Sequence, residues 1–101
     1  MKNFKDLIFK DKQFGGVGAH FTFDNGVEIS VQAGEFPYCS PRVSGLNAYE
    51  YTSFEIALFF ENGDFATKQI AGKGFNDEDV AGWVSPKNID EIMEQAQTYK
   101  K

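Results

Sequence analysis

The side chain best suited to covalent chemistry in this sequence is Cys39, the only cysteine among 101 residues. A catalytic cysteine acts as a thiolate, which a nearby cation stabilises, and it is commonly paired with a histidine base. Arg42 lies close in sequence, and His20 is the only histidine. One hypothesis is therefore a small enzyme that uses Cys39, Arg42 and His20. The alternative is a partly buried structural thiol and no catalytic residue, which we favour because no known motif supports this pairing.

Metal and cofactor sites have little support in the sequence. One histidine and one cysteine cannot complete a tetrahedral zinc site without carboxylates. The acidic run at residues 77–79 lacks the alternating ligands and fixed glycine of a calcium-binding loop. The glycines at residues 15–18 precede a predicted strand, whereas phosphate-binding loops lead into a helix. We expect no metal, no cofactor and no enzymatic activity.

The charge of the chain is negative and unevenly distributed. Fifteen Asp and Glu oppose ten Lys and Arg, which gives a formal net charge of −5, and lysines are concentrated near the N-terminus. An acidic body repels phosphate backbones, so we expect no direct nucleic-acid binding. It suits a basic surface on a protein partner, and the alternative is that the acidic residues only maintain solubility.

The sequence predicts one soluble domain, residues 1–101, in the cytoplasm. A chain of this length is near the commonest size of a single domain. The lone cysteine excludes an internal disulfide and indicates a reducing compartment. The first residues lack the apolar segment of a signal peptide, and no apolar run approaches the ~20 residues that span a membrane.

The elements that would position these side chains are mainly strands. Apolar and polar residues alternate over residues 17–23 and 27–33, on either side of Asp24-Asn25-Gly26. A two-residue turn would mix the apolar and polar faces. A three-residue turn pairs Phe21 with Ile29 and places the apolar residues on one face. We therefore predict a hairpin with Gly26 in the left-handed conformation.

The remainder of the chain predicts a second hairpin and a helix. Residues 54–60 form the third strand and residues 65–70 the fourth, with a turn at residues 61–64 of two or three residues. Residues 1–12 suit either a helical turn or an edge strand, and residues 34–51 and 71–84 read as loops. Ser85 as N-cap and Pro86 begin a helix with an apolar stripe, and Trp83 is expected to cover its start. The predicted fold class is α+β, an antiparallel sheet of about four to five strands built from two hairpins and packed on one C-terminal helix.

Two stretches together resemble a group of small phage proteins. They are residues 23–31, followed by Tyr38-Cys39-Ser40-Pro41-Arg42, and Gly82-Trp83-Val84-Ser85-Pro86 leading into residues 89–93. Small accessory proteins of tailed phages and prophages, of about this length, are similar to this pattern of Asn-Gly strand hairpin and C-terminal helix. The resemblance implies a phage or mobile-element accessory protein in the host cytoplasm. It implies no catalytic residue.

The leading functional hypothesis is a non-enzymatic protein that binds a host or phage protein. Tyrosines in or beside the long loop are favoured at interfaces, because they bury area at low entropic cost. The expected contact residues are Tyr38, Arg42, Tyr49 and Tyr51. An acidic inhibitor is a sharper form of the hypothesis, in which carboxylates occupy a basic cleft; its candidates are Glu50, Glu55, Glu61 and Asp64. The alternatives are the enzyme based on Cys39 and a virion or assembly component that associates with itself.

Overall fold

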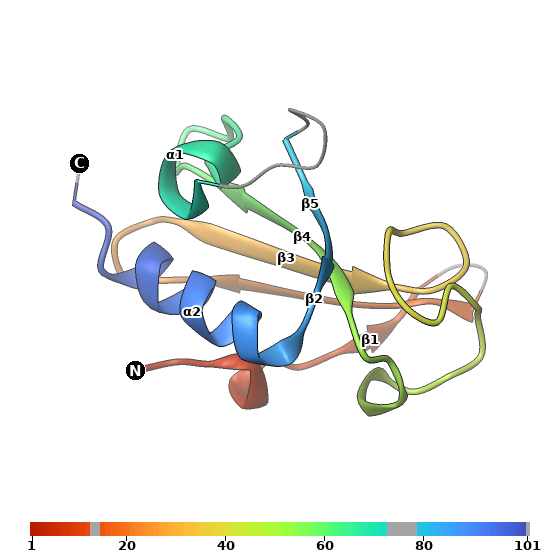
Figure 1. The fold of residues 1–101 in the computed structure, drawn as a ribbon. Coiled ribbons are helices and arrows are strands. Elements are labelled where there is room, and N and C mark those ends of the chain that lie inside the picture. The colour runs from red at the N-terminus through yellow and green to blue at the C-terminus, as the bar shows by residue number, and fades with distance from the viewer. Residues whose placement is uncertain (13–14, 73–78, 101) are drawn as a thin grey trace.

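The computed structural model describes residues 1–12, 15–72 and 79–100, and their strands form one antiparallel sheet. The strands are neighbours in chain order (Figure 1): β1 (Lys10–Asp11), β2 (Val17–Thr22), β3 (Glu28–Ala33), β4 (Phe54–Phe59) and β5 (Ala81–Val84). The helix α2 (Pro86–Gln97) lies against one face of this sheet. The predicted α+β class, with about four to five strands and a C-terminal helix, is confirmed.

The hairpin of β2 and β3 has the predicted register. Phe21 lies opposite Ile29, and Val17 lies opposite Ala33. The backbone N–H of Gly26 donates to the carbonyl of Phe23 at 2.9 Å, and Gly26 has a φ of 88°. Only glycine takes this conformation without a steric penalty, so the Asp24-Asn25-Gly26 turn keeps every apolar side chain of the hairpin on one face.

Helix α2 begins and packs as its sequence indicates. The Ser85 hydroxyl accepts a hydrogen bond from the Asn88 N–H at 3.2 Å, and Pro86 occupies the first turn, where no N–H is needed. The apolar stripe of the helix is almost completely buried; it consists of Ile89, Ile92, Met93 and Ala96. This stripe contributes to one core with the apolar side chains of the sheet.

The predicted fourth strand is wrong. Phe65 forms an isolated bridge to Phe59 of β4 after a three-residue turn, and the Ala66 N–H donates to the Leu58 carbonyl at 2.7 Å. The chain then forms the short helix α1 (Thr67–Ala71). The buried Thr67 hydroxyl accepts a hydrogen bond from the Leu58 N–H at 2.9 Å and donates to the Asp79 carbonyl at 2.7 Å. Because the Thr67 hydroxyl accepts from the Leu58 N–H, the chain can leave the sheet here without leaving that buried N–H unbonded.

The segment that pairs with β4 is instead β5, in a region predicted as loop. Val84 lies opposite Phe54 and Ala81 opposite Ile56, so the two residues between them face Glu55 alone. This is a β-bulge, an extra residue that locally bends a strand. The second of the bulged residues, Trp83, has a φ of 52°. The acidic residues Asp77 and Glu78 lie outside the described residues.

The N-terminal segment forms both of the elements that its sequence suggested. Residues Phe4–Asp6 form a 3₁₀ turn, η1, capped by Asn3, and β1 follows as an edge strand. Side chains of α2 hold the segment: Asp90 accepts from the Phe4 N–H at 2.8 Å, and Gln97 exchanges two hydrogen bonds with the backbone of Lys2. The N-terminus therefore runs beside α2 and closes that side of the core.

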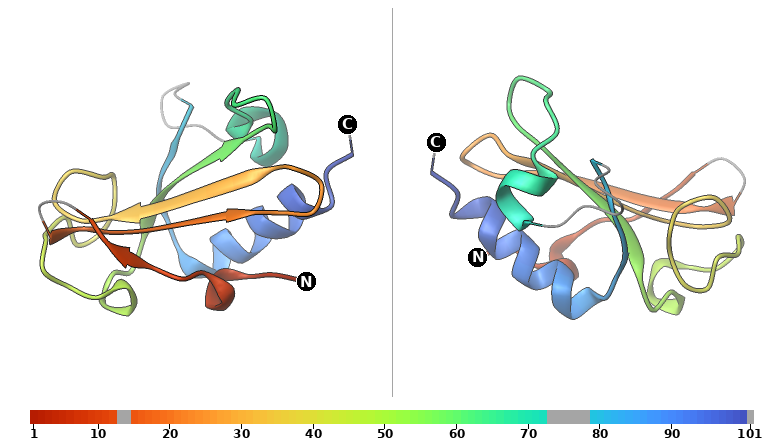
Figure 2. Two further views of the ribbon diagram at one scale, coloured as in Figure 1. Left: turned by 180° about the vertical axis from the view of Figure 1, so that it is seen from behind. Right: turned by 45° about the horizontal axis from the view of Figure 1, so that its top comes forward.

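Helices cover one face of the sheet, whereas no described helix lies over the other. Helices α1 and α2 both lie on one face, and from behind, the strands stand in front of α2 with no described helix over them (Figure 2, left). The core occupies the covered side, and its fully buried large side chains include Phe54, Ile29, Ile56, Leu58, Ile89 and Met93. The uncovered side, here named the open face, is where polar side chains of the strands gather.

Candidate functional site

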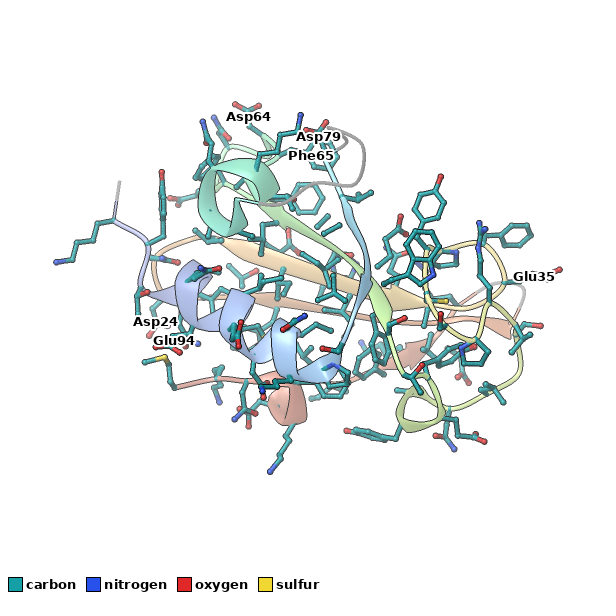
Figure 3. The ribbon with its side chains drawn as sticks, viewed as in Figure 1. Asp24, Glu35, Asp64, Phe65, Asp79 and Glu94 are labelled. Atoms are coloured by element: carbon teal, nitrogen blue, oxygen red, sulfur yellow. The ribbon has the colours of Figure 1, made fainter. Side chains whose placement is uncertain are left out.

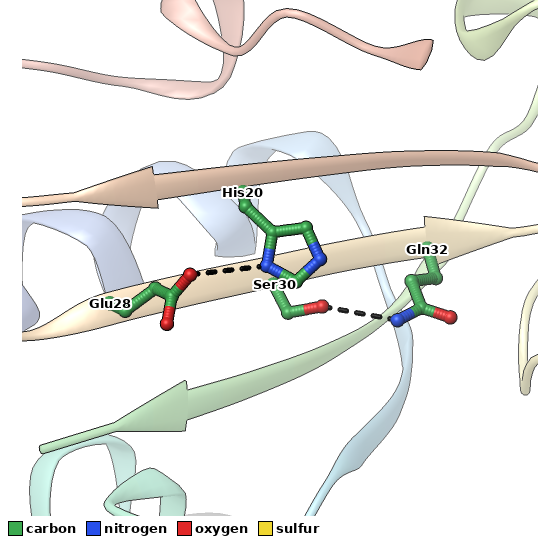
Figure 4. Close-up of polar contacts among 4 residues, drawn as sticks. All are labelled: His20, Glu28, Ser30 and Gln32. Carbon is green, nitrogen blue, oxygen red and sulfur yellow. Dashed lines mark hydrogen bonds and ion pairs between the residues drawn. The ribbon is translucent and has the colours of Figure 1, made fainter. Parts of the chain in front are cut away.

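The open face carries a row of polar side chains on β2 and β3. A His20 ring nitrogen, Nδ1, lies 3.2 Å from the Glu28 carboxylate, and the Gln32 amide donates to the Ser30 hydroxyl at 3.2 Å (Figure 4). His20 lies directly opposite Ser30 in the register. This row follows from strand geometry, because successive side chains point to opposite faces and the residues between these polar ones point into the core. These four side chains are paired with one another, and we name them the polar floor of the open face.

Tyr38, Trp83 and Arg42 form a stacked group at one edge of this polar floor. The ring centroids of Tyr38 and Trp83 are 5.3 Å apart, and the Arg42 guanidinium carbon lies 5.1 Å from the Tyr38 centroid. Trp83 is 43% exposed, and Phe36, in the same loop as Tyr38, is 64% exposed. We name Phe36, Tyr38, Arg42 and Trp83 the aromatic ridge. Trp, Tyr and Arg are the residue types that most often dominate binding energy in protein interfaces.

The bulge in β5 positions the ridge. The Trp83 N–H donates to the Tyr38 carbonyl at 2.9 Å. A side chain at Gly82 would place its Cβ 2.8 Å from the Tyr38 Cβ, so the glycine makes room for the tyrosine. A bulky residue in the left-handed region costs roughly 1–2 kcal/mol. The fold therefore accepts strain at Trp83 and keeps its ring partly exposed beside Tyr38.

The loop that carries the ridge is tied to the domain at several points. Arg42 donates to the Phe36 carbonyl at 2.7 Å and to the Pro37 carbonyl at 3.0 Å. The buried Cys39 thiol donates to the Gly34 carbonyl at 3.2 Å, and Sγ accepts from the N–H of the same residue. These hydrogen bonds order the loop in the free chain, which lowers the entropic cost of binding through it.

A groove of about 480 Å³ runs along the open face beside the ridge. Phe36 and Pro37 form one wall, and Lys12, Gln32 and Glu55 carry its polar groups. Partial burial raises the pKa of the Glu55 carboxyl above its ordinary value, and the nearby Arg42 and Lys12 oppose this rise. The groove thus combines an apolar wall with a partly buried carboxyl group whose charge two nearby cations favour.

The structure divides the predicted contact residues. Tyr38 and Arg42 are brought together in the ridge. Tyr51 belongs to the core, at 3% exposure, and its hydroxyl donates to the Val43 carbonyl at 2.6 Å, so it presents no surface to a partner. Tyr49 is 69% exposed but packs edge-on against Phe4, 6.2 Å between centroids, away from the ridge.

The predicted acidic residues do not form one surface. Glu50 lies before β4 and accepts from the Asn47 N–H at 3.0 Å, whereas Glu61 and Asp64 lie in the turn after β4. A strand of this length separates its ends by about 17 Å. In Figure 3, Asp64 projects from the side of the molecule that carries α1, far from Glu35. A basic cleft would therefore contact only part of this set.

The residues of the enzyme hypothesis are also separated. Cys39 is 1% exposed, with its thiol hydrogen-bonded to the backbone of Gly34. His20 lies in the middle of β2 and is paired with Glu28, and Arg42 is bound to loop carbonyls. Gly34 follows the end of β3, four residues beyond the partner of His20, which corresponds to about 13 Å along a strand. The structure does not bring Cys39 and His20 together.

Two members of the ridge were missed by the sequence reasoning. Trp83 was expected over the start of α2, and Phe36 was assigned no role. The pair Gly82-Trp83 was a usable signal, because a glycine inside a strand often marks a bulge or a close approach of backbone. That signal was hidden by the assignment of residues 71–84 to a loop.

Comparison with known proteins adds no relative. No protein-family model matches the chain, and neither a curated protein nor a solved structure is detectably similar to it. Within the described ranges, no helix is long and apolar enough to cross a membrane. The same residues contain no group of three or more His, Cys, Asp or Glu side chains arranged to hold a metal ion.

Proposed function

We propose that this chain is a non-enzymatic binding protein, an accessory protein of a phage or mobile element, that holds a host or phage protein on its open face. The observation that carries the proposal is Trp83. Its left-handed backbone is strained, its ring is 43% exposed, and it stacks on Tyr38. Strained residues persist where the surrounding structure fixes them, and they are concentrated at binding and catalytic sites.

The composition and order of the ridge support a protein partner. An indole, a phenol and a guanidinium stacked together offer a large, partly apolar contact with polar edges. The hydrogen bonds of Arg42 to the loop carbonyls hold the arrangement before any partner arrives. The adjacent groove gives an apolar side chain of the partner a place to bury. The phage origin and the host cytoplasm rest on the sequence resemblance alone.

The acidic-inhibitor form of the proposal has weaker support. Its carboxylates lie at both ends of β4, and the Glu55 carboxyl is partly buried. The enzyme alternative has still less support, because Cys39 is buried and lies apart from His20. The ridge is therefore the surface on which we base the experiment.

The test is an affinity pull-down from bacterial lysate at low and moderate salt, with bound proteins identified by mass spectrometry. The baits are the wild-type chain, Trp83→Gly and Tyr49→Ala. Glycine suits the left-handed backbone, so Trp83→Gly removes the ring without adding strain. Tyr49→Ala removes an exposed aromatic that packs against Phe4 and is not a member of the ridge.

We expect one stoichiometric partner on the wild-type and Tyr49→Ala baits, and at least about a tenfold loss on Trp83→Gly, the size of ~1.4 kcal/mol. Equal capture by Trp83→Gly, with its fold intact by circular dichroism, contradicts the ridge. Loss of a partner with a basic surface at moderate salt on every bait favours the acidic inhibitor. Empty baits with self-association of the chain favour the assembly component.

A further inference from the structure

The side-chain stem of Lys12, the residue that follows β1, lies over Gly18 of the neighbouring strand β2 on the open face. The missing side chain of Gly18 makes this position available, because a Cβ there would lie 2.7 Å from the Lys12 Cδ. Gly18 is not among the residues with positive φ. Its backbone does not demand glycine, so the space that it leaves is used by the lysine stem.

Lys12 joins two grooves. It lines the groove beside the ridge, and it also lines a second groove of about 380 Å³ formed with Ile8, Lys10, Gly18 and His20. We name the first the Phe36 groove and the second the lysine groove. Since one side chain borders both, the two grooves adjoin at Lys12, and we name them together the track.

The two grooves differ in charge. The Phe36 groove has an apolar wall, and its charged lining residues among those described are Lys12 and two carboxyl groups, from Glu35 and Glu55. Among the described residues that line the lysine groove, Lys10 and Lys12 are cations and none is acidic. His20 lies there too, with Glu28 as its partner. In a chain with a net charge of −5, this local pair of lysines favours a ligand carboxylate at one end of the track only.

We infer that the track holds an extended peptide segment in which an apolar side chain stands two positions from an acidic one. This inference rests on the proposed function and specifies the partner. Residues two apart in an extended chain project to the same side at about 6.5–7 Å spacing, so two such side chains can enter two grooves that share a bordering residue. The apolar side chain occupies the Phe36 groove, and the carboxylate pairs with Lys12 and Lys10.

The charges of the two grooves disfavour the reverse arrangement, in which the acidic side chain enters the Phe36 groove. A carboxylate there would share Lys12 with Glu35 and Glu55, which repel it. A lysine in the lysine groove would face Lys10 and Lys12. The track therefore distinguishes an acidic segment from its charge-reversed counterpart, and binding weakens as salt screens the lysines.

The experiment measures binding of fluorescein-labelled synthetic peptides by fluorescence anisotropy. The probe peptide is Gly/Ser-rich, with one Phe and one Glu two positions apart, and the comparison peptides replace the Glu with Gln or Lys. The proteins are the full wild-type chain, Lys12→Gln, Gly18→Ala, and Lys5→Gln as a control lysine in η1, outside both grooves.

We expect the wild-type chain and Lys5→Gln to prefer the Glu peptide over the Gln peptide by about tenfold in Kd, the size of a charge-assisted hydrogen bond. Lys12→Gln removes that preference, and Gly18→Ala reduces it by displacing the lysine. A preference that survives Lys12→Gln overturns the inference, and so does failure of the Glu peptide to bind better than the Lys peptide. If Lys12→Gln still captures a partner that Trp83→Gly loses, the proposed function stands and only this inference fails.

Discussion

The side-chain amide of Asn25 donates a hydrogen bond to the main-chain carbonyl of Ala96, at 2.8 Å. A second bond runs to the carbonyl of Tyr99 at 3.1 Å. The last carbonyls of a helix have no partner within the helix, so a residue of the β2–β3 turn caps α2. The turn after β4 has the same Phe-Xaa-Asn-Gly sequence, and its Asn62 binds only within its own turn among the bonds described.

The two turns form a matched pair for mutation. In each, the asparagine oxygen accepts the N–H two residues on, in Val27 and in Asp64. Alanine removes that bond from both turns, and only Asn25→Ala also removes the cap of α2. We expect Asn25→Ala to lower the free energy of unfolding by about 1–3 kcal/mol more than Asn62→Ala does. Urea denaturation checks this, and equal losses would show that the cap contributes nothing.

The Thr67 hydroxyl is expected to be essential where the chain leaves β4. Thr67→Val keeps the shape but leaves the buried Leu58 N–H without a partner, which costs about 1–3 kcal/mol. Thr67→Ser keeps both hydrogen bonds and loses one methyl group, at about 1 kcal/mol. Chemical denaturation of both variants, with unchanged m-values, should rank Ser above Val. If Thr67→Val were more stable than Thr67→Ser, the hydrogen bonds of the hydroxyl would not explain how the chain leaves β4.

The Glu55 carboxyl is expected to make stability depend on pH. Its pKa is raised by burial, with Arg42 and Lys12 opposing the rise, so the folded chain binds the proton more tightly than the unfolded chain. The favourable contribution is full below the ordinary value of 4.5 and is lost as pH rises through the folded pKa. Glu55→Gln should gain stability relative to wild type over that rise. A difference between the two that does not change with pH would contradict the assignment.

The Cys39 thiol is expected to react only when the domain opens. It is 1% exposed and hydrogen-bonded to Gly34, so alkylating reagents reach it through unfolding or loop opening. Alkylation by iodoacetamide, followed by mass spectrometry, should be slow in buffer and should rise steeply with urea near the unfolding transition. Fast alkylation of the folded chain at neutral pH would revive the enzyme hypothesis.

Local signals were sufficient for part of the fold. The register of β2 and β3 follows from alternation and from the conformation of Gly26, and the start of α2 follows from Ser85 and Pro86. These features depend on residues close together in the sequence. Local signals failed for residues 65–70, which were predicted as a strand. Most of this segment forms helix α1, and the Thr67 hydroxyl accepts the Leu58 N–H in place of a strand carbonyl.

The candidate site was recovered only in part. Residue type and loop position predict Tyr38 and Arg42 as contact residues, and in the structure the Arg42 guanidinium lies over the Tyr38 ring. Tyr51 was chosen on the same grounds and is buried, because its ring packs 6.1 Å from Phe54 and its hydroxyl has a carbonyl partner. Residue type favours an interface, but exposure depends on what the rest of the chain places above the ring.

The sequence by itself determined the strand alternation, the two Asn-Gly turns, the amphipathic helix and the acidic balance, because neighbouring residues encode each of them. Tertiary structure alone decided that β5 pairs with β4 through a bulge, that Trp83 stacks on Tyr38, and that Lys12 lies over Gly18. It also joined Asn25 to Ala96, residues 71 apart in sequence. Such contacts depend on which surfaces meet when the core closes, and no local pattern carries that information.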